Sequence, residues 1–410
     1  MLLALSGWSL TVLIGAGLFV LYLLLPTIIT GVLRFRVAFV RDPVPTPVAA
    51  TPPGSEVRDL ADRLEPIRRR YKVPALAGAV VRDGKLTALG AVGVRRAGHA
   101  EPVTPADLFH LGSCTKAMTA TLCARLVRQG KLRWNSSIAE VFPDVAPIVG
   151  EAYRAATLEH LLTHRAGIDE GFAFSANIWP KVWELTGPLD RQRVELMKLV
   201  LQGDPGTPLG TQYAYSNCGY AIAGAMCERV TGRPWEGLMR ELIFDPLGMT
   251  SAGYGPPGTA AVDQPWGHRL GFWIGQWTPM PPGPKADNPA VIGPAGGVHC
   301  SLADWAKFVA LHAGGADGDG SFLPTDTFRV LHSPTLGGDY AFGWSVLERD
   351  WGGGKVLMHN GSNTMWMCVV WLAPRRGLAL LAATNLGTGL ASAACDAAVG
   401  KLLDLAGEKA

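Results

Sequence analysis

Hydrophobic positions form one long, nearly continuous run at the start of this chain. The first 33 residues carry no charged side chain and include the run LLALSGWSLTVLIGAGLFVLYLLL. A helix of this length is long enough to cross about 30 Å of hydrocarbon. We therefore predict a single membrane span over residues 1–33. A cleaved signal peptide is the alternative, but the run is longer than the usual apolar core of such a signal, and no Lys or Arg precedes it.

Proline then replaces the apolar pattern. The stretch DPVPTPVAATPPGS, which begins at Asp42, holds five prolines in fourteen residues. Such a composition favours an extended, semi-rigid spacer. We predict a linker over residues 34–54, followed by a globular domain over residues 55–408.

The domain begins with a helical and then an alternating pattern. Apolar residues recur at spacings of three and four from Val57 to Tyr71, which predicts an amphipathic helix with Ser55 as its cap. The runs ALAGAVV and LTALGAVGV predict two strands, and the Asp83-Gly84 dipeptide between them favours a tight hairpin turn. From Ser113 to about Cys300 the pattern is mainly helical.

A tract rich in Pro, Gly and Trp, from Gly253 to Pro294, interrupts the helical pattern, and we expect it to form the wall of a cleft. Strand patterns return in YAFGWSVLE, VLMHN, MWMCVVWLA and LALLAATN, and a last helix is predicted near Ala391 to Leu405. Strands thus come from both ends of the domain. They predict an α+β fold in which one antiparallel sheet is built from the two ends, with a helical region inserted between them.

Composition narrows the class of protein. Hydrophobic residues make up 48% of the chain and charged residues 17%, which is typical of a globular domain. Beyond residue 54 there are 34 basic and 33 acidic residues, so we expect no nucleic-acid partner. The seven cysteines are odd in number and include no C-x-x-C, which argues against a disulfide framework or a zinc ribbon. We expect most of them to be small buried hydrophobes.

The stretch HLGSCTKAMTA, which begins at His110, carries the first candidate chemistry. Ser113 and Lys116 lie three positions apart at a predicted helix start, and side chains at this spacing share one helix face. A serine hydroxyl is a poor nucleophile until a neighbouring base takes its proton, and a desolvated lysine can be that base or can assist another. The same spacing also occurs by chance, for example in the small-residue start of a buried helix.

A second candidate segment, YAYSNCGY, lies about 100 residues further on. Tyr215 and Asn217 are two positions apart, so in an extended loop they project to the same side. A tyrosine with a pKa near 10 is no base at neutral pH unless a cation stabilises its phenolate, and Lys116 could supply that charge.

The third segment is MHNGSN, at the end of a predicted strand. Gly361 would let a substrate approach the strand edge, and the N–H of Ser362 could face a developing oxyanion. His359 precedes them as a possible substrate contact.

Other catalytic signatures are missing. The sequence has no G-x-S-x-G, no G-x-x-x-x-G-K-[ST] and no H-E-x-x-H. His160 and His164 lie one helical turn apart, as two metal ligands would, but no third ligand is evident. We therefore expect structural or capping roles for both, and neither a metal nor a cofactor.

The three segments together resemble the S-x-x-K, Y-x-N and K-T-G or H-x-G motifs of the class C β-lactamase and penicillin-binding-protein superfamily of serine hydrolases. The resemblance extends over about residues 60 to 390 and includes TLEHLLTHRAGI, IFDPLGMTSAGYG and PAGGVHCSLADWAKF. It implies a five-stranded antiparallel sheet flanked by helices, an all-helical subdomain, and a site between them.

The same resemblance implies a role for each candidate residue. Ser113 would be the acylated nucleophile, with Lys116 and Tyr215 as the proton-transfer pair. Asn217 would contact a substrate amide, and the N–H groups of Ser113 and Ser362 would form the oxyanion hole.

Two residues depart from the motifs. His359 stands where β-lactamases of this kind carry a lysine that would hold a β-lactam carboxylate, and an ordinary imidazole titrates near pH 6.5. If neutral His359 contacts the substrate, activity should fall as it protonates. Met365 stands where relatives often have glycine and would narrow the site. Both departures favour an esterase or a D-amino-acid peptidase over an efficient β-lactamase.

The sequence therefore predicts a membrane-anchored serine hydrolase that acts on a small-molecule or peptide substrate. The N-terminal helix would contact the lipid bilayer. The substrates of relatives favour an extracytoplasmic domain, although Arg34, Arg36 and Arg41 after the span favour the opposite side.

A cell-wall peptide sensor that has lost turnover is the alternative function, and a structural membrane protein with no site is a third possibility. The oligomeric state is left open.

Overall fold

The computed structural model describes residues 57–271, 277–314 and 320–407. The chain divides into two units, residues 1–42 with 270–278 and residues 43–269 with 279–410. Only residues 270, 271, 277 and 278 of the first unit are described. The second unit contains the main sheet and the helices. The predicted anchor (1–33), the predicted linker (34–54) and Ser55 lie outside the described residues.

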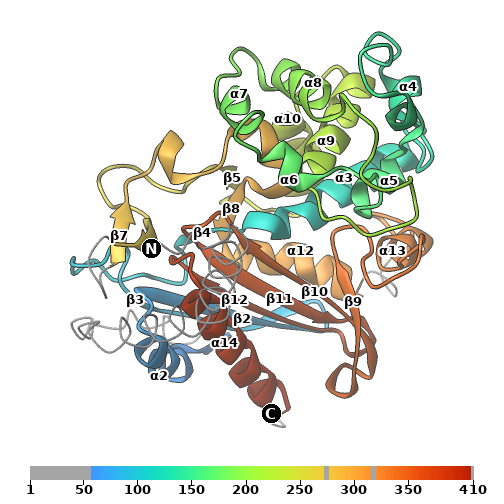
Figure 1. Ribbon diagram of the computed structural model, residues 1–410. Coiled ribbons are helices and arrows are strands. Elements are labelled where there is room, and N and C mark those ends of the chain that lie inside the picture. Colours follow the sequence, from blue (N-terminus) through green and yellow to red (C-terminus); the bar gives the residue numbers. More distant parts are fainter. Residues whose placement is uncertain (1–56, 272–276, 315–319, 408–410) are drawn as a thin grey trace, which may run out of the picture. The chain divides into compact units, whose positions relative to one another are not determined.

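A seven-stranded sheet forms the centre of this unit, in the order β1-β3-β2-β12-β11-β10-β9 (Figure 1). All neighbours are antiparallel except β1, which runs parallel to β3. The first and last parts of the domain meet where β2 pairs with β12, as the strand patterns predict. The strands are β1 (Arg58–Asp59), β2 (Ala75–Arg82), β3 (Lys85–Gly93), β9 (Ser345–Arg349), β10 (Gly354–Ser362), β11 (Met367–Ala373) and β12 (Leu378–Thr384).

The implied count of five strands is wrong, because one strand is added at each edge. β9 pairs with the free edge of β10, and the two-residue β1 pairs with β3. β9 is shorter than the predicted strand from Tyr340, because the chain turns back at Gly343 (φ +83°) and Val346 N–H donates to the Asp339 carbonyl. The Asp83-Gly84 hairpin is confirmed: both residues have positive φ, as a type I′ turn requires.

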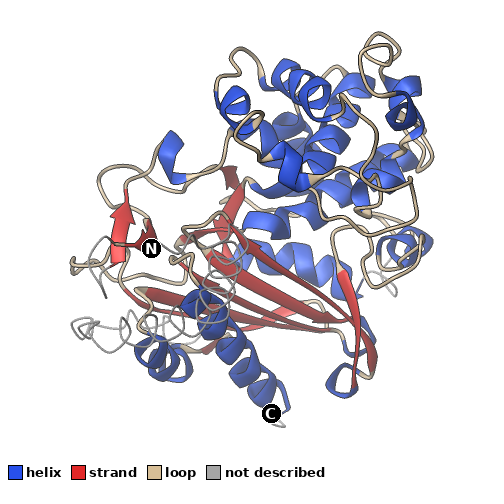
Figure 2. Cartoon of the chain, viewed as in Figure 1, coloured by secondary structure: helices blue, strands red, loops and turns tan. Residues whose placement is uncertain are grey.

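Helices cover both faces of the sheet (Figure 2). α2 (Ala61–Tyr71) and α14 (Gly389–Gly407) pack on one face, and α12 (Leu302–Gly314) packs on the other. α2 begins later than the predicted helix, because Leu60 N–H bonds to the Leu89 carbonyl of the sheet and the Asp59 carboxylate accepts from the first helical N–H. The structure therefore contradicts a helix cap at Ser55.

The inserted region is helical, as predicted, and lies above the α12 face in Figure 1. Its elements are α3 (Thr115–Arg128), α4 (Ile138–Val141), η2 (Glu151–Ala155), α5 (Leu158–Leu162), α6 (Glu170–Ala173), α7 (Trp179–Trp183), α8 (Leu189–Val200), α9 (Asn217–Thr231), α10 (Trp235–Met239) and η3 (Arg240–Phe244).

The remaining elements are short. They are β4 (Leu108–His110), η1 (Gly112–Cys114), β5 (Gly253–Tyr254), β6 (Gly267–Leu270), β7 (Trp277–Met280), η4 (Pro284–Ala286), η5 (Ala290–Ile292), α11 (Gly293–Gly296), β8 (Val298–Ser301), α13 (Thr325–Leu331), η6 (Asp350–Gly352) and η7 (Pro374–Arg376). Of these, β4, β8 and β5 form a small antiparallel sheet.

Within the described ranges, no helix has both the length and the apolar character needed to span a membrane. All seven cysteines are free and buried, which confirms their predicted place in the core.

Candidate active site

Ser113 lies in η1, directly before α3, where backbone N–H groups near a helix start favour negative charge. Two glycines bring this turn against β10. A Cβ on Gly112, which has φ +48°, would lie 2.4 Å from the Ser362 nitrogen. A Cβ on Gly361 would lie 2.0 Å from the Leu111 carbonyl oxygen and 2.8 Å from the Ser113 nitrogen. Only glycine at both positions permits this approach, which gathers the backbone nitrogens of Ser113 and Ser362 in one small region.

Four of the predicted side chains are joined by hydrogen bonds around Ser113 and Lys116. Ser113 Oγ lies 2.7 Å from Tyr215 OH and 3.1 Å from Lys116 Nζ. Lys116 Nζ also donates to Asn217 Oδ1 and to the Ala295 carbonyl oxygen, each at 2.8 Å. One residue each from η1, α3, the loop before α9 and the start of α9 thus forms this hydrogen-bonded group. Tyr215 lies in the loop, whereas Asn217, predicted in the same extended segment, is already the first residue of α9.

Burial changes the acid–base chemistry of this group. Lys116 is 0% exposed, and desolvation lowers the pKa of its amine to about 7, although the Glu170 carboxylate acts in the opposite direction. A neutral amine has two N–H donors and one lone pair. Two of the contacts of Nζ are carbonyl-type acceptors that take the donors, so the lone pair is left for the proton of Ser113 Oγ.

The environment of Tyr215 does not favour the phenolate form that a base would require. Burial raises the pKa of its phenol far above the ordinary value of 10, against a smaller opposing effect of the hydrogen bond to Ser113. Lys116 Nζ lies 4.8 Å from the centre of the Tyr215 ring, over its face. The phenol is therefore a proton donor at neutral pH, and the amine is the stronger candidate for the base.

Glu170, on α6, belongs to the site but has no signature in the sequence. Its Oε1 accepts from the backbone N–H of Asn217 at 2.9 Å and from Asn217 Nδ2 at 2.8 Å, and its Oε2 accepts from Ser216 Oγ at 2.9 Å. Because Nδ2 is tied to the carboxylate, Oδ1 of the same amide turns toward Lys116. No motif in IDEGF links it to a residue 47 positions away.

His164 and His160 have the structural roles that the sequence predicts. His164 Nδ1 accepts from the Ser216 N–H at 3.0 Å, and its ring centre lies 4.4 Å from that of Tyr215. Burial holds its pKa well below 6.5, so it packs as a neutral ring. His160 Nδ1 accepts from the Thr157 N–H at 3.2 Å and closes a capping box at the start of α5. The described part of the chain contains no cluster of three or more metal-ligating side chains.

This geometry can be compared with known proteins. The family model described as "Beta-lactamase" matches residues 60–404. The chain belongs to the β-lactamase family. The matched range contains all three candidate segments, which begin at His110, Tyr213 and Met358, and the protein is a serine hydrolase of that family.

Relatives and solved structures agree with the family assignment. "Penicillin-binding protein 4" of Amycolatopsis lactamdurans is 29% identical over 338 residues, which cover 80% of this chain and 84% of the relative. "Unguisins hydrolase ungD'" of Aspergillus campestris is 27% identical, and the match covers 80% of this chain but 61% of the relative. The octameric penicillin-binding protein homologue from Pyrococcus abyssi has the same fold, with a TM-score of 0.66 at 22% identity, covering 85% of this chain and 77% of that one.

The His359 imidazole of this β-lactamase-family protein makes its hydrogen bonds with residues outside the Ser113 group. It is 5% exposed, its Nδ1 donates to the Asn360 carbonyl at 2.6 Å, and its Nε2 accepts from Tyr340 OH at 3.0 Å. Burial, aided by the charge of Lys116, lowers its pKa to about 4. The ring is therefore neutral above about pH 5, and the expected titration near pH 6.5 is corrected downward.

A cavity of about 780 Å³ opens beside Ser113. Ser113, Asn217 and Ser362 line it, and much of its wall comes from the tract Gly253 to Pro294, as the sequence predicts. Met365 instead packs in the core, and Thr364, with φ +77°, lines the cavity in its place. Two predicted substrate-binding residues, His359 and Gly361, do not belong to the described residues that line this cavity.

Proposed function

We propose that this protein cleaves ester or amide bonds, including peptide-like ones, through an acyl intermediate on Ser113. The observation that carries the proposal is the position of Ser113 Oγ, which lies within hydrogen-bond distance of both Lys116 Nζ and Tyr215 OH at the edge of a large cavity. A nucleophile next to its base, with the base held by further partners, is the arrangement that acyl transfer needs.

The proposed reaction begins with the neutral Lys116 amine. The amine takes the proton of Ser113 Oγ while the oxygen forms a bond to the substrate carbonyl carbon. The negative charge that develops on the carbonyl oxygen would be met by the N–H groups of Ser113 and Ser362. The carbonyl then re-forms, the bond to the leaving group breaks, and Tyr215 OH gives that group a proton, which the Lys116 ammonium restores. A water molecule then gives a proton to the Lys116 amine as its oxygen forms a bond to the acyl carbon. The bond from that carbon to Ser113 Oγ breaks, Tyr215 OH gives Oγ a proton that the Lys116 ammonium restores, and the acid is released.

The finer assignment is an esterase or a D-amino-acid peptidase. A fixed cation in place of His359 would favour a substrate carboxylate, but the buried imidazole carries no charge at neutral pH. This difference argues against efficient turnover of β-lactams. The names of the relatives, a penicillin-binding protein and a hydrolase of unguisins, support the binding and hydrolysis of a small molecule.

The anchor and the location remain part of the proposal. The apolar run over residues 1–33 supports attachment to a membrane, with the hydrolase domain on the extracytoplasmic side. A reporter fusion after residue 54 tests the side, because only one orientation gives a periplasmic signal.

Two measurements on the full chain test the enzymatic proposal. A fluorophosphonate should label Ser113, and Ser113→Ala should lose both the label and at least about 10³-fold in the hydrolysis of short p-nitrophenyl esters. Equal hydrolysis by Ser113→Ala would end the proposal. A fluorescent penicillin or ester that forms a lasting adduct at Ser113, with no turnover of any ester, would favour the sensor instead.

A further inference from the structure

The cavity beside Ser113 has mainly apolar and aromatic walls. Its lining includes Phe174, Trp183, Leu189, Trp235, Tyr254 and Ile292. Cavities of this size with few polar groups are the usual form of small-molecule sites. The apolar part of a substrate therefore has a clear place to bind, and the few charged groups in the lining decide which substrates can enter.

Those charged groups are all negative. Among the described residues that line the cavity, Glu236 and Asp287 are the only Asp, Glu, Lys, Arg or His side chains. Asp287 accepts hydrogen bonds from Asn363 Nδ2 at 3.0 Å and the Asn288 N–H at 2.8 Å, and His110 Nε2 lies 2.8 Å from it. Burial alone would raise the pKa of Asp287, but His110 and these hydrogen bonds lower it.

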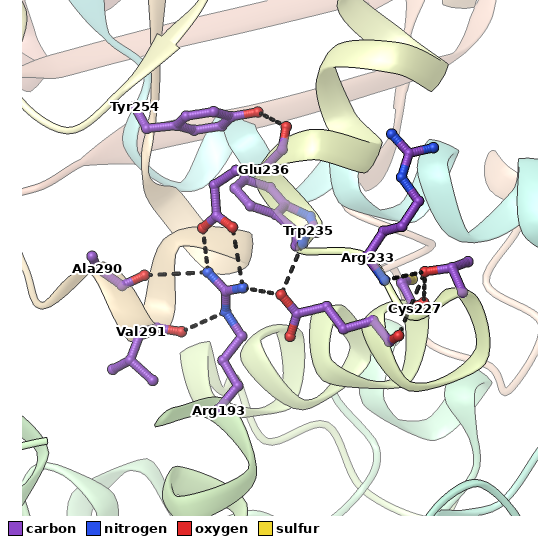
Figure 3. Close-up of polar contacts among 10 residues, drawn as sticks. Arg193, Cys227, Arg233, Trp235, Glu236, Tyr254, Ala290 and Val291 are labelled. Carbon is purple, nitrogen blue, oxygen red and sulfur yellow. Dashed lines mark hydrogen bonds and ion pairs between the residues drawn. The ribbon is translucent and has the colours of Figure 1, made fainter. Parts of the chain in front are cut away.

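Glu236 is held in place from behind by Arg193. The Arg193 guanidinium is 0% exposed and is bound by Glu236 and by the carbonyl oxygens of Ala290 and Val291 (Figure 3). Glu228 also forms an ion pair with it. Glu236 is 23% exposed and lines the cavity, whereas Arg193 does not. A ligand in the cavity thus meets the carboxylate, and the cation behind it is already shared between two anions.

Aromatic faces lie beside this carboxylate. Trp235 precedes Glu236 on α10, and Tyr254 OH donates to the Glu236 carbonyl oxygen at 2.7 Å (Figure 3). Both rings line the cavity. Trp235 is 0% exposed and the Arg193 guanidinium lies 5.7 Å from its ring centre, so of these two rings the half-buried Tyr254 is the one open to a ligand. A carboxylate next to this Tyr ring is a favourable environment for an ammonium group and an unfavourable one for a second carboxylate.

We propose that the cavity accepts substrates whose apolar part is uncharged or carries an ammonium group, that it rejects substrates with a carboxylate there, and that Glu236 sets this preference. The proposal rests on the proposed function and adds the charge class of its substrates. Glu236 acts by contact with the substrate, and Arg193 positions it.

The test compares three p-nitrophenyl esters of one alkanoate chain that ends in trimethylammonium, tert-butyl or carboxylate. Trimethylammonium and tert-butyl have the same shape, so they differ in charge. We expect kcat/KM for the trimethylammonium ester to exceed that for the tert-butyl ester by about three- to tenfold. The carboxylate ester should be at least about tenfold slower than the tert-butyl ester. A carboxylate ester as fast as the tert-butyl ester would overturn the proposal.

A variant then assigns the effect to Glu236. Glu236→Gln should narrow the spread among the three esters by at least about threefold, with Asp287 still in the lining, whereas Asp326→Asn, which removes an exposed charge on α13, should keep the original spread. An unchanged spread in Glu236→Gln would contradict the role of Glu236. If that variant does not fold, the salt dependence of the parent is the readout, because added salt should narrow the spread at a partly exposed carboxylate and an unchanged spread would contradict the proposal.

These outcomes separate the two proposals. If the parent hydrolyses all three esters at similar rates and Ser113→Ala does not, the charge preference fails and the proposed function holds. If none is hydrolysed faster than by Ser113→Ala, the proposed function itself fails.

Discussion

Lys116 and Arg193 are both fully buried cationic side chains, but their partners differ. Lys116 is surrounded by a hydroxyl, an amide oxygen and a carbonyl oxygen, and burial lowers the pKa of its amine to about 7. Arg193 is bound by two carboxylates, and a guanidinium stays protonated in proteins. Burial therefore allows Lys116 to give up its proton, whereas the charge of Arg193 is balanced by two carboxylates. The difference marks Lys116 as the residue fitted for proton transfer and Arg193 as a structural support.

The largest expected effect follows from making Lys116 permanently charged. Lys116→Arg removes the lone pair that would accept the Ser113 proton, so kcat/KM for p-nitrophenyl esters should fall by about 10³- to 10⁴-fold. Lys401→Arg, on the exposed surface of α14, should stay within twofold of the parent. A folded Lys116→Arg protein with more than a tenth of the parental activity would show that the amine is not the base.

The next effect is on stability. Arg193→Met leaves Glu228 and Glu236 without their shared cation in a buried place, and the free energy of unfolding should fall by about 3–5 kcal/mol. Arg229→Met, which breaks an exposed pair with Asp144, should cost about 1 kcal/mol or less. Urea denaturation measures both. Equal losses in the two variants would mean that burial does not distinguish this cluster.

Tyr215→Phe separates the proton donor from the base. The variant keeps the ring but removes the hydroxyl 2.7 Å from Ser113 Oγ. Turnover of amides, whose leaving group needs a proton, should fall by about 10²-fold, while p-nitrophenyl esters, whose leaving group does not, should lose much less. The kcat ratio of the two substrate types is the readout. Equal losses for both would place Tyr215 in the deprotonation of Ser113 instead.

Glu170→Gln gives the smallest effect, a shift along the pH axis. The Glu170 carboxylate raises the pKa of Lys116, because an anion favours the protonated amine. Its removal should move the acidic limb of the pH profile of kcat/KM to lower pH, by less than about one unit. Glu195→Gln, on the surface of α8, is the matched control. A shift to higher pH would contradict the assigned electrostatics.

Local patterns predicted the elements of this fold well. The hairpin at Asp83-Gly84, the pairing of strands from both ends of the domain and the helical insertion all follow from periodicity and turn residues. The strand that starts at Ser345 was predicted to start at Tyr340, because the turn at Gly343 is decided by backbone contacts to Asp339 that the local pattern does not contain.

The site was predictable only where a motif carries it. Ser113, Lys116, Tyr215 and Asn217 are found from their spacing and the family resemblance, and they meet in space. Glu170 is not, since its role depends on a contact with Asn217 across 47 residues. The lowered pKa of His359 could not be predicted from the sequence either, because its burial against Tyr340 depends on tertiary packing.

The central claim, that Lys116 is the base, is tested most directly by the pH dependence of Ser113 acylation. The rate of fluorophosphonate labelling at Ser113, followed by intact-protein mass spectrometry from pH 5 to 10, should rise with pH as the amine loses its proton and should be half-maximal near pH 7. His359, with a pKa of about 4, should add no step in this range. A labelling rate that is flat across these pH values, or that rises only near pH 10, would contradict the account.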